Sequence, residues 1–239
     1  MIADRKIDVL STGELSHELV ERAATAGVSI AVVPFIKIEE ITDPKVKAEI
    51  DRIASTNATV VFTSRNAVEA MITILGNRKP DWTVFSIEGS TSEFAAEHFG
   101  NDRVIEGGFD GRSLAGTIIQ RSKEKEVFFF CGDQRRDELP DLLRSQGIAV
   151  HEIIVYRNVP TPQRIDRDLD AIMFFSPSAV NSFFSMNEWN EGTIAFVIGS
   201  TTATAVVGKA SRVIVAERPS RETMIDEVIA HFNTVVRSK

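Results

Sequence analysis

The feature that most constrains the fold of this chain is an internal repeat. Three runs return further along the chain with similar residues: 61–68 (VFTSRNAV) as 173–180 (MFFSPSAV), 85–91 (FSIEGST) as 196–202 (FVIGSTT), and 18–30 as 138–150. A repeat on this scale predicts two similar α/β units in one chain. Two lobes leave a cleft between them, and such clefts are where small ligands commonly bind.

The fold class follows from short apolar runs that end in small polar residues and are followed by amphipathic segments. The expected strands are 7–10, 30–33, 59–62, 84–87, 127–130, 153–156, 171–175 and 194–198. The expected helices are 15–26, 45–54, 67–75, 94–99, 114–122, 139–145, 180–185, 203–207 and 223–236. Gly27 and Gly147 follow helix ends, where a left-handed residue is favoured. We therefore predict an α/β protein with two similar lobes, parallel sheets flanked by helices, and a ligand cleft between the lobes.

Two extended, half-polar stretches are predicted to link the lobes. Residues 34–40 and 153–160 occupy equivalent places in the repeat, and each continues from a strand. Neither is rich in Gly and Ser, so neither reads as a flexible tether. We expect them to pair as a short antiparallel ladder that acts as a hinge.

Composition excludes several classes of function. The chain has 34 acidic and 27 basic residues, with a formal net charge of -7 and no basic stripe, so no nucleic-acid partner is expected. The single cysteine, Cys131, excludes an internal disulfide, and the scattered histidines give no metal-ligand spacing. With no signal peptide and no apolar run of ~20 residues, we expect a cytoplasmic monomer without metal, cofactor or membrane contact.

The strongest candidate site residues follow the apolar strands. Ser64-Arg65-Asn66 and Ser176-Pro177-Ser178 each open a helix at what should be the carboxyl edge of a parallel sheet, the usual place for ligands. Free N–H groups and the positive dipole end of a helix favour carboxylates or phosphates there. The alternative is that these residues only cap helices, because Ser and Asn are common N-caps.

Two further strand-end loops carry polar groups. Gly89-Ser90-Thr91 and Gly199-Ser200-Thr201-Thr202 offer hydroxyl and N–H donors beside a glycine, with helix capping as the alternative. In the third loop, Arg135 and Arg136 could clamp a carboxylate or pair with neighbouring acidic residues, and Cys131 reads as a small buried residue. No catalytic triad or carboxylate pair stands out, so the pattern indicates a polar cleft without a protein nucleophile.

Four segments, in this order, resemble the uroporphyrinogen-III synthase family: 128–140, 155–157, 175–180 and 198–203, within a match that runs from about Thr59 to Glu217. The resemblance implies a bilobal fold in which the chain leaves the first lobe, builds the second and returns. On this chain the first lobe would be 1–35 plus 161–239, and the second 39–158.

The resemblance also implies a reaction, the cyclisation of the linear tetrapyrrole hydroxymethylbilane with loss of water and inversion of the last pyrrole ring through a spiro intermediate. Tyr156 matches the family's tyrosine and would donate a proton to the departing hydroxide. The resemblance implies Ser64, Thr91, Ser176, Ser178, Ser200 and Thr202 as substrate-binding residues, and the strand-end loops described above add Arg65, Asn66 and Arg136. The competing interpretation of Tyr156 is packing between the lobes.

The chain departs from the family pattern after its first strand. Many members carry an Arg-Pro pair where this chain has Ser11-Thr12-Gly13-Glu14, so a basic contact would have to come from elsewhere, with Arg65 or Arg112 as candidates. The competing hypothesis for the whole chain is a non-enzymatic, two-lobed protein that binds or senses a different anionic ligand.

Overall fold

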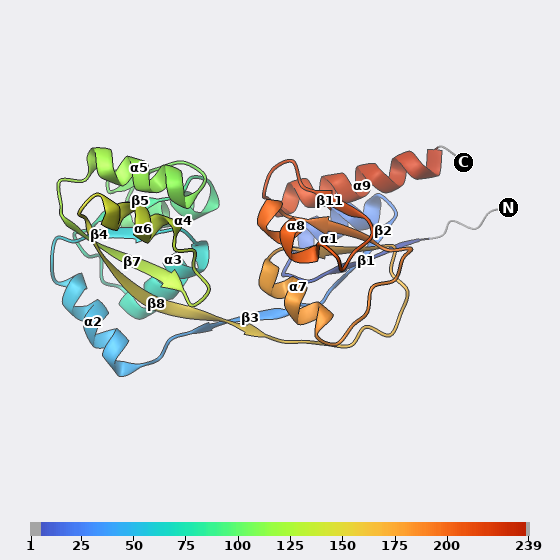
Figure 1. Cartoon of the computed structure of the whole chain (residues 1–239), viewed down its shortest axis with the longest axis horizontal. Helices are drawn as coiled ribbons and strands as arrows, with labels where there is room; N and C mark the ends of the chain where they lie inside the picture. Colours follow the sequence, from blue (N-terminus) through green and yellow to red (C-terminus); the bar gives the residue numbers. More distant parts are fainter. Residues whose placement is uncertain (1–5, 238–239) are drawn as a thin grey trace. The chain divides into compact units, whose positions relative to one another are not determined.

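The structure, a computed structural model, describes residues 6–237 and divides into two compact units. The first unit joins the N-terminal segment, which ends at Lys37, to the C-terminal segment, which begins at Val159. The second unit is one continuous stretch, Ile38–Asn158. In Figure 1 the first unit therefore contains the blue and the orange-red ends of the chain, whereas the second is coloured from blue through yellow.

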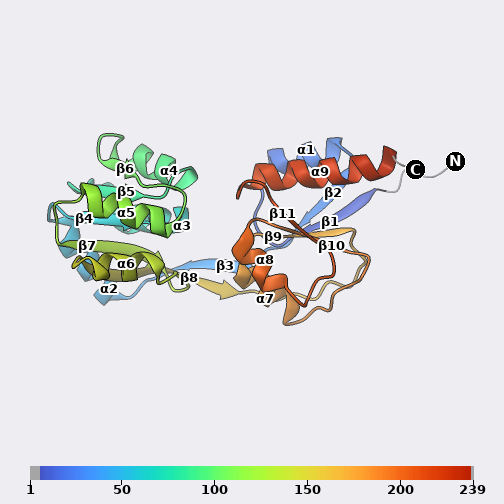
Figure 2. The same ribbon diagram turned by 45° about the horizontal axis from the view of Figure 1, so that its top comes forward.

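A five-stranded sheet forms the centre of the first unit, in the order β11-β10-β9-β1-β2 with every pair parallel. The strands are β1 (Ile7–Ser11), β2 (Val28–Val32), β9 (Ala171–Phe174), β10 (Ile194–Val197) and β11 (Val213–Val215). The helices are α1 (His17–Thr25), α7 (Pro177–Phe184), α8 (Ser200–Val206) and α9 (Arg221–Arg237). Helices α1 and α9 bury their apolar faces on one side of the sheet, and α7 and α8 do so on the other (Figure 2).

A six-stranded sheet forms the centre of the second unit, in the order β3-β8-β7-β4-β5-β6. The strands are β3 (Ile36–Glu40), β4 (Thr59–Phe62), β5 (Thr83–Ser86), β6 (Val104–Glu106), β7 (Glu126–Gly132) and β8 (Ala149–Pro160). The helices are α2 (Pro44–Ala54), α3 (Arg65–Leu75), α4 (Ser90–Phe99), α5 (Gly111–Arg121) and α6 (Glu138–Ser145). Helices α2, α3 and α4 cover one face, and α5 and α6 cover the other. The α/β class with parallel sheets flanked by helices is thus confirmed.

The two linking stretches run side by side as β3 and β8 at the edge of the second sheet. The N–H of Ile41 donates to the carbonyl of Val155 (3.1 Å), and the N–H of Thr161 donates to the carbonyl of Phe35 (3.0 Å). The partner number falls as the residue number rises, so this pair is antiparallel. The expected antiparallel ladder is present, and its action as a hinge stays a prediction.

Most differences from the sequence prediction lie at element ends. The short edge strands β6 and β11 were not predicted, because each is only three residues long and its side chains are half-exposed or exposed. Helices α4 and α5 begin three or four residues earlier than expected, because their first turns are polar. Gly27 and Gly147 have φ values of 83° and 76°, so the predicted left-handed helix ends are confirmed.

Candidate functional site

The predicted site residues fall in both units, at or near the carboxyl ends of the parallel strands. The second unit holds Ser64, Arg65, Asn66, Thr91, Arg136 and Tyr156, and the first holds Ser176, Ser178, Ser200 and Thr202. All except Arg136 and Tyr156 belong to the first turn, or the N-cap, of a helix that follows a strand. The repeat therefore places equivalent polar loops at the same edge of each sheet.

Tyr156 is the side chain with the most defined surroundings among these residues. It lies on β8, is 7% exposed, and its hydroxyl donates to Oγ of Ser64 at 3.1 Å. Ser64 is the N-cap of α3, and the same Oγ accepts from the N–H of Asn66 at 3.2 Å. The cap fixes the serine, and the serine in turn fixes the direction of the phenol.

The surroundings of Tyr156 keep its hydroxyl protonated. Burial raises the pKa of this phenol above its usual value, because the anion would lose its hydration, and the hydrogen bond with Ser64 opposes the change only in part. An ordinary tyrosine already has a pKa near 10. The hydroxyl therefore keeps its proton throughout the neutral range.

Gly132 is a residue of this site that sequence reasoning missed. It ends β7, and a Cβ built there would lie 2.5 Å from Cζ and 2.8 Å from the hydroxyl oxygen of Tyr156. Only glycine leaves room for the phenol ring in this position. The available signal was a glycine directly after the buried run that ends at Cys131.

A pocket of about 320 Å³ opens beside Tyr156 in the second unit. Its lining comes from the strand-end loops of the second sheet and includes Thr63, Ser64, Ile87, Phe109, Asp110, Gly111, Gly132, Gln134, Arg135, Arg136 and Tyr156. Of the residues predicted for the second unit, the pocket brings together Ser64, Arg136 and Tyr156. Arg65, Asn66 and Thr91 do not line it.

The two arginines of the loop after β7 differ in their surroundings. Arg135 forms ion pairs with Asp137 and with Glu152, which is also paired with Arg144. The structure therefore shows the alternative for Arg135, which is pairing with neighbouring acidic residues. For Arg136, binding of a ligand carboxylate stays a prediction. Cys131 is 1% exposed, and burial raises the pKa of its thiol to about 12, which confirms the prediction of a small buried residue.

Other predicted residues of the second unit pack locally. The Arg65 guanidinium lies 4.3 Å from the centre of the Phe94 ring. Thr91 is 5% exposed in the first turn of α4, whose N-cap is Gly89. Since the N-caps of α4 and α8 are Gly89 and Gly199, which have no side chain to cap the helix, hydroxyl capping does not account for these two Gly-Ser-Thr loops.

In the first unit, Ser176 has the same capping role as Ser64. Its Oγ accepts from the N–H of Ala179 at 3.1 Å and lies 3.2 Å from Oγ of Ser178. Thr202 is 3% exposed, whereas Ser200 is exposed at the start of α8. Capping is thus confirmed for both predicted serines, Ser64 and Ser176, and their binding of a ligand stays a prediction.

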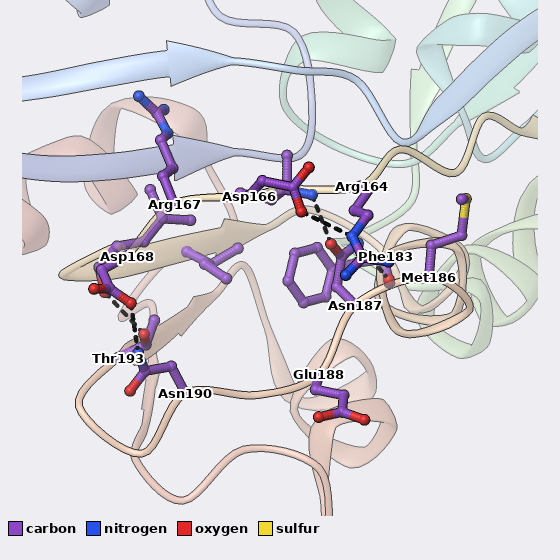
Figure 3. Close-up of a pocket in the computed structure, with 13 residues that line it drawn as sticks. Arg164, Asp166, Arg167, Asp168, Phe183, Met186, Asn187, Glu188, Asn190 and Thr193 are labelled. Carbon is purple, nitrogen blue, oxygen red and sulfur yellow. Dashed lines mark hydrogen bonds and ion pairs between the residues drawn. The ribbon is translucent and has the colours of Figure 1, made fainter.

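A larger pocket of about 590 Å³ lies elsewhere in the first unit (Figure 3). Leu169 and Thr193, which line it, precede β9 and β10, so it lies at the amino ends of the strands. Its polar groups bond to one another, with Arg164 bound to Asp166 at 2.8 Å and Asn190 to Asp168 at 3.0 Å. The polar groups of this pocket are paired with one another, and the pocket lies at the edge of the sheet opposite Ser176. It is therefore not part of the predicted site.

Neither a metal-binding cluster nor a membrane-crossing helix is found in residues 6–237. No group of three or more His, Cys, Asp or Glu side chains in this part of the chain is arranged to hold a metal ion. No helix in the same stretch combines the length and the apolar character that a membrane crossing requires.

Comparison with known proteins assigns the family. Residues 17–226, most of the chain, match the family model of uroporphyrinogen-III synthase HemD. The chain belongs to the uroporphyrinogen-III synthase family. A curated member, the porphyrin biosynthesis protein HemD of Ruminiclostridium josui, is 27% identical over 94% of this chain. The chain spans about half of that protein's length, 48%.

Solved structures of uroporphyrinogen-III synthases share the fold. The protein from Helicobacter pylori aligns over 94% of this chain and 99% of its own, with a TM-score of 0.66 and 16% identity. A mutant of the synthase from the extremely thermophilic bacterium Thermus thermophilus aligns over 98% of this chain and 100% of its own, with a TM-score of 0.67 and 14% identity. At this level of identity the likeness concerns the fold alone.

The loop after β1 departs from the synthase family's pattern because it carries no arginine. Both candidates for replacing that arginine, Arg65 and Arg112, have partners inside the second unit. Arg112 forms an ion pair with Glu138 at 3.1 Å, and Arg65 lies over Phe94. Neither contact supports a role for these residues as the substitute.

Proposed function

We propose that this chain converts hydroxymethylbilane into uroporphyrinogen III. The observation that carries the proposal is the Tyr156 hydroxyl, which is buried, protonated and held on Ser64 beside a pocket at the strand ends. Membership of the synthase family supplies the substrate class. The chain spans about half of its curated relative's length, so the synthase activity is a proposal for this chain and is not transferred from the relative.

Tyr156 would act when water leaves the substrate. The bond from carbon to the hydroxyl oxygen breaks, the phenol delivers its proton to that oxygen, and the neighbouring pyrrole stabilises the cation that remains. The substituted carbon of the terminal ring attacks the cation to form the spiro intermediate, which fragments and closes again with that ring inverted. The final loss of a proton from the pyrrole carbon returns a proton to the phenolate, so the step releases one water and nothing else.

The remaining predicted residues would hold the eight carboxylates of the substrate. Hydroxyl groups and the N–H groups of first helical turns can bind carboxylates without added basic residues, which suits a chain of net charge -7. We assign this role to Ser64, Arg65, Asn66, Thr91 and Arg136 in the second unit and to Ser176, Ser178, Ser200 and Thr202 in the first. By fixing a flexible chain, such contacts would select the ring that reacts.

The assembly and location of the protein stay predictions. We propose a monomer in the cytoplasm that has no nucleic-acid partner. The excess of acidic residues supports the absence of a nucleic-acid partner. Light scattering coupled to size exclusion tests the monomer, and a mass twice that of the chain would contradict it.

A coupled assay tests the activity. Hydroxymethylbilane is generated in place, the products are oxidised, and the uroporphyrin isomers are separated by chromatography. We expect type III product in excess over the type I product that forms spontaneously. Type I product alone, at the spontaneous rate and with folded protein, would instead favour the two-lobed binding protein for another anion.

A further inference from the structure

The two sheets have the same strand order once the chain is permuted. The first sheet reads β11-β10-β9-β1-β2, and the second reads β6-β5-β4-β7-β8 before its extra edge strand β3. Strand β9 thus corresponds to β4, and β1 corresponds to β7. Each loop around the Tyr156 pocket therefore has a counterpart at the carboxyl edge of the first sheet.

The loops of the first sheet have counterparts in the second. Ser176 corresponds to Ser64, because each is the N-cap of the helix that follows β9 or β4. The loop at Glu14 after β1 corresponds to the loop at Gln134 after β7, and α9 corresponds to α5. The first residue of α5 is Gly111, which lines the Tyr156 pocket, and the first residue of α9 is Arg221.

The Arg221 side chain is held against this edge by two contacts. Its Nε donates to the carbonyl oxygen of Glu14 at 2.9 Å. Its guanidinium carbon lies 5.5 Å from the centre of the Phe175 ring, and Phe175 directly precedes the cap Ser176. The cation is thus fixed between the loops that follow β1 and β9.

Arg221 also differs from Arg135, which lies in the loop after β7 at the same edge of the second sheet. Arg135 is neutralised there by Asp137 and Glu152. Arg221 is exposed, and no carboxylate within residues 6–237 pairs with it. Its Nε is used for positioning, which leaves the two terminal nitrogens for an external anion.

We propose that Arg221 binds a carboxylate of the substrate at the carboxyl edge of the first sheet. This inference rests on the proposed function for the identity of the substrate. Arg221 does not take part in the bond-breaking steps. It determines how tightly one arm of the linear tetrapyrrole is held.

Binding of uroporphyrin III, the stable oxidised form of the proposed product, tests the assignment by fluorescence titration. Arg221→Gln is expected to raise the Kd about tenfold, the loss typical of one charged hydrogen-bonded contact. KM should rise in parallel while kcat stays within twofold. Arg221→Lys keeps the charge and loses the bond to Glu14, so it should recover part of the affinity, and high salt should shrink the difference between Arg221→Gln and the parent chain.

Arg167→Gln is the matched control, because Arg167 lies in the pocket at the opposite edge of the same sheet. It should leave Kd unchanged, and thermal melts should show both glutamine variants folded. A Kd for Arg221→Gln within twofold of the parent, or no binding of uroporphyrin III by the parent, would overturn the assignment. If the parent yields only type I product but binds uroporphyrin III in an Arg221-dependent way, the synthase proposal falls and the anion site stands.

Discussion

Ser64 in the second unit and Ser176 in the first cap equivalent helices after equivalent strands, and their hydroxyl groups have different partners. Ser64 accepts a hydrogen bond from the buried phenol of Tyr156. Ser176 lies beside the hydroxyl of Ser178. The repeated scaffold supplies the cap twice, but only in the second unit does a buried phenol hydroxyl donate a hydrogen bond to it.

The arginines at the carboxyl edges of the two sheets also differ in their partners. In the second unit the arginine Arg135 is paired internally, whereas in the first unit Arg221 has no carboxylate partner in the part of the chain that the structure describes. We infer a division of work in which the proposed proton donor lies in the second unit alone and the arginine without a carboxylate partner lies in the first, while carboxylate contacts are proposed in both. The following predictions test that division.

The largest effect is expected from Gly132→Ala. The new methyl group would lie within 2.8 Å of three atoms of the Tyr156 ring end, so the ring must shift from the position in which it bonds to Ser64. We expect turnover to fall about 100-fold, as small displacements of a reacting group can do. Steady-state kinetics measures the change.

Gly116→Ala is the matched control for that variant. Gly116 lies inside α5, and no atom comes within 4 Å of a Cβ built there. Turnover should stay unchanged and the free energy of unfolding should rise by roughly 0.5–1 kcal/mol. Equal turnover of the Gly132→Ala and Gly116→Ala variants would show that the position of Tyr156 set by Gly132 does not matter for turnover.

Tyr156→Phe isolates the hydroxyl from the ring. The variant keeps the packing and loses the proton donor, so turnover should fall at least ~10-fold, or about 1.4 kcal/mol of barrier. KM should change little, because the hydroxyl acts on the leaving group. Full turnover in a folded Tyr156→Phe protein would assign Tyr156 to packing only.

The two caps should respond differently to removal. Ser64→Ala and Ser176→Ala each remove an N-cap and should lower the free energy of unfolding by ~1 kcal/mol. Ser64→Ala should also lower kcat about fivefold, since ~1 kcal/mol of positioning is lost at Tyr156. Ser176→Ala should raise KM and leave kcat unchanged. The reverse pattern in kinetics and denaturant melts would break the division between the units.

The smallest effect concerns pH. Tyr156 is the single tyrosine in the chain, so its ionisation can be followed directly by tyrosinate absorbance. Burial raises the pKa of the folded protein's tyrosine, so the absorbance should rise at a higher pH than in the unfolded chain, whose tyrosine ionises near the ordinary value of 10.

The same shift sets the sign of a stability change. Above pH 10 the unfolded tyrosine loses its proton while the folded one keeps it, so the free energy of unfolding falls as pH rises. Relative to Tyr156→Phe, the parent should lose at most about 1.4 kcal/mol by pH 11. A native titration curve that coincides with that of the urea-unfolded chain would contradict a buried donor.

Sequence alone predicts the strands that are mostly apolar, such as 59–62 and 171–175, because full burial on two faces requires such runs. It also locates the serine caps, since a capping residue must directly follow the strand loop. It does not predict which side chains meet across the sheet. Ser64 and Tyr156 are 92 residues apart and touch because β7 separates their strands and ends in a glycine. Arg221 was missed for the same reason, because its partners lie in distant parts of the chain.

The discontinuous first unit has a consequence for how the chain is made. A ribosome releases the sequence in order, so β1 and β2 emerge first, and the whole of Ile38–Asn158 follows before β9. Until then the first sheet lacks three of its five strands, including β9, which lies at its centre and pairs with β1. The unit that begins the chain therefore completes its core last, and the unit that carries Tyr156 can form its core while the first is still waiting for the rest of its sheet.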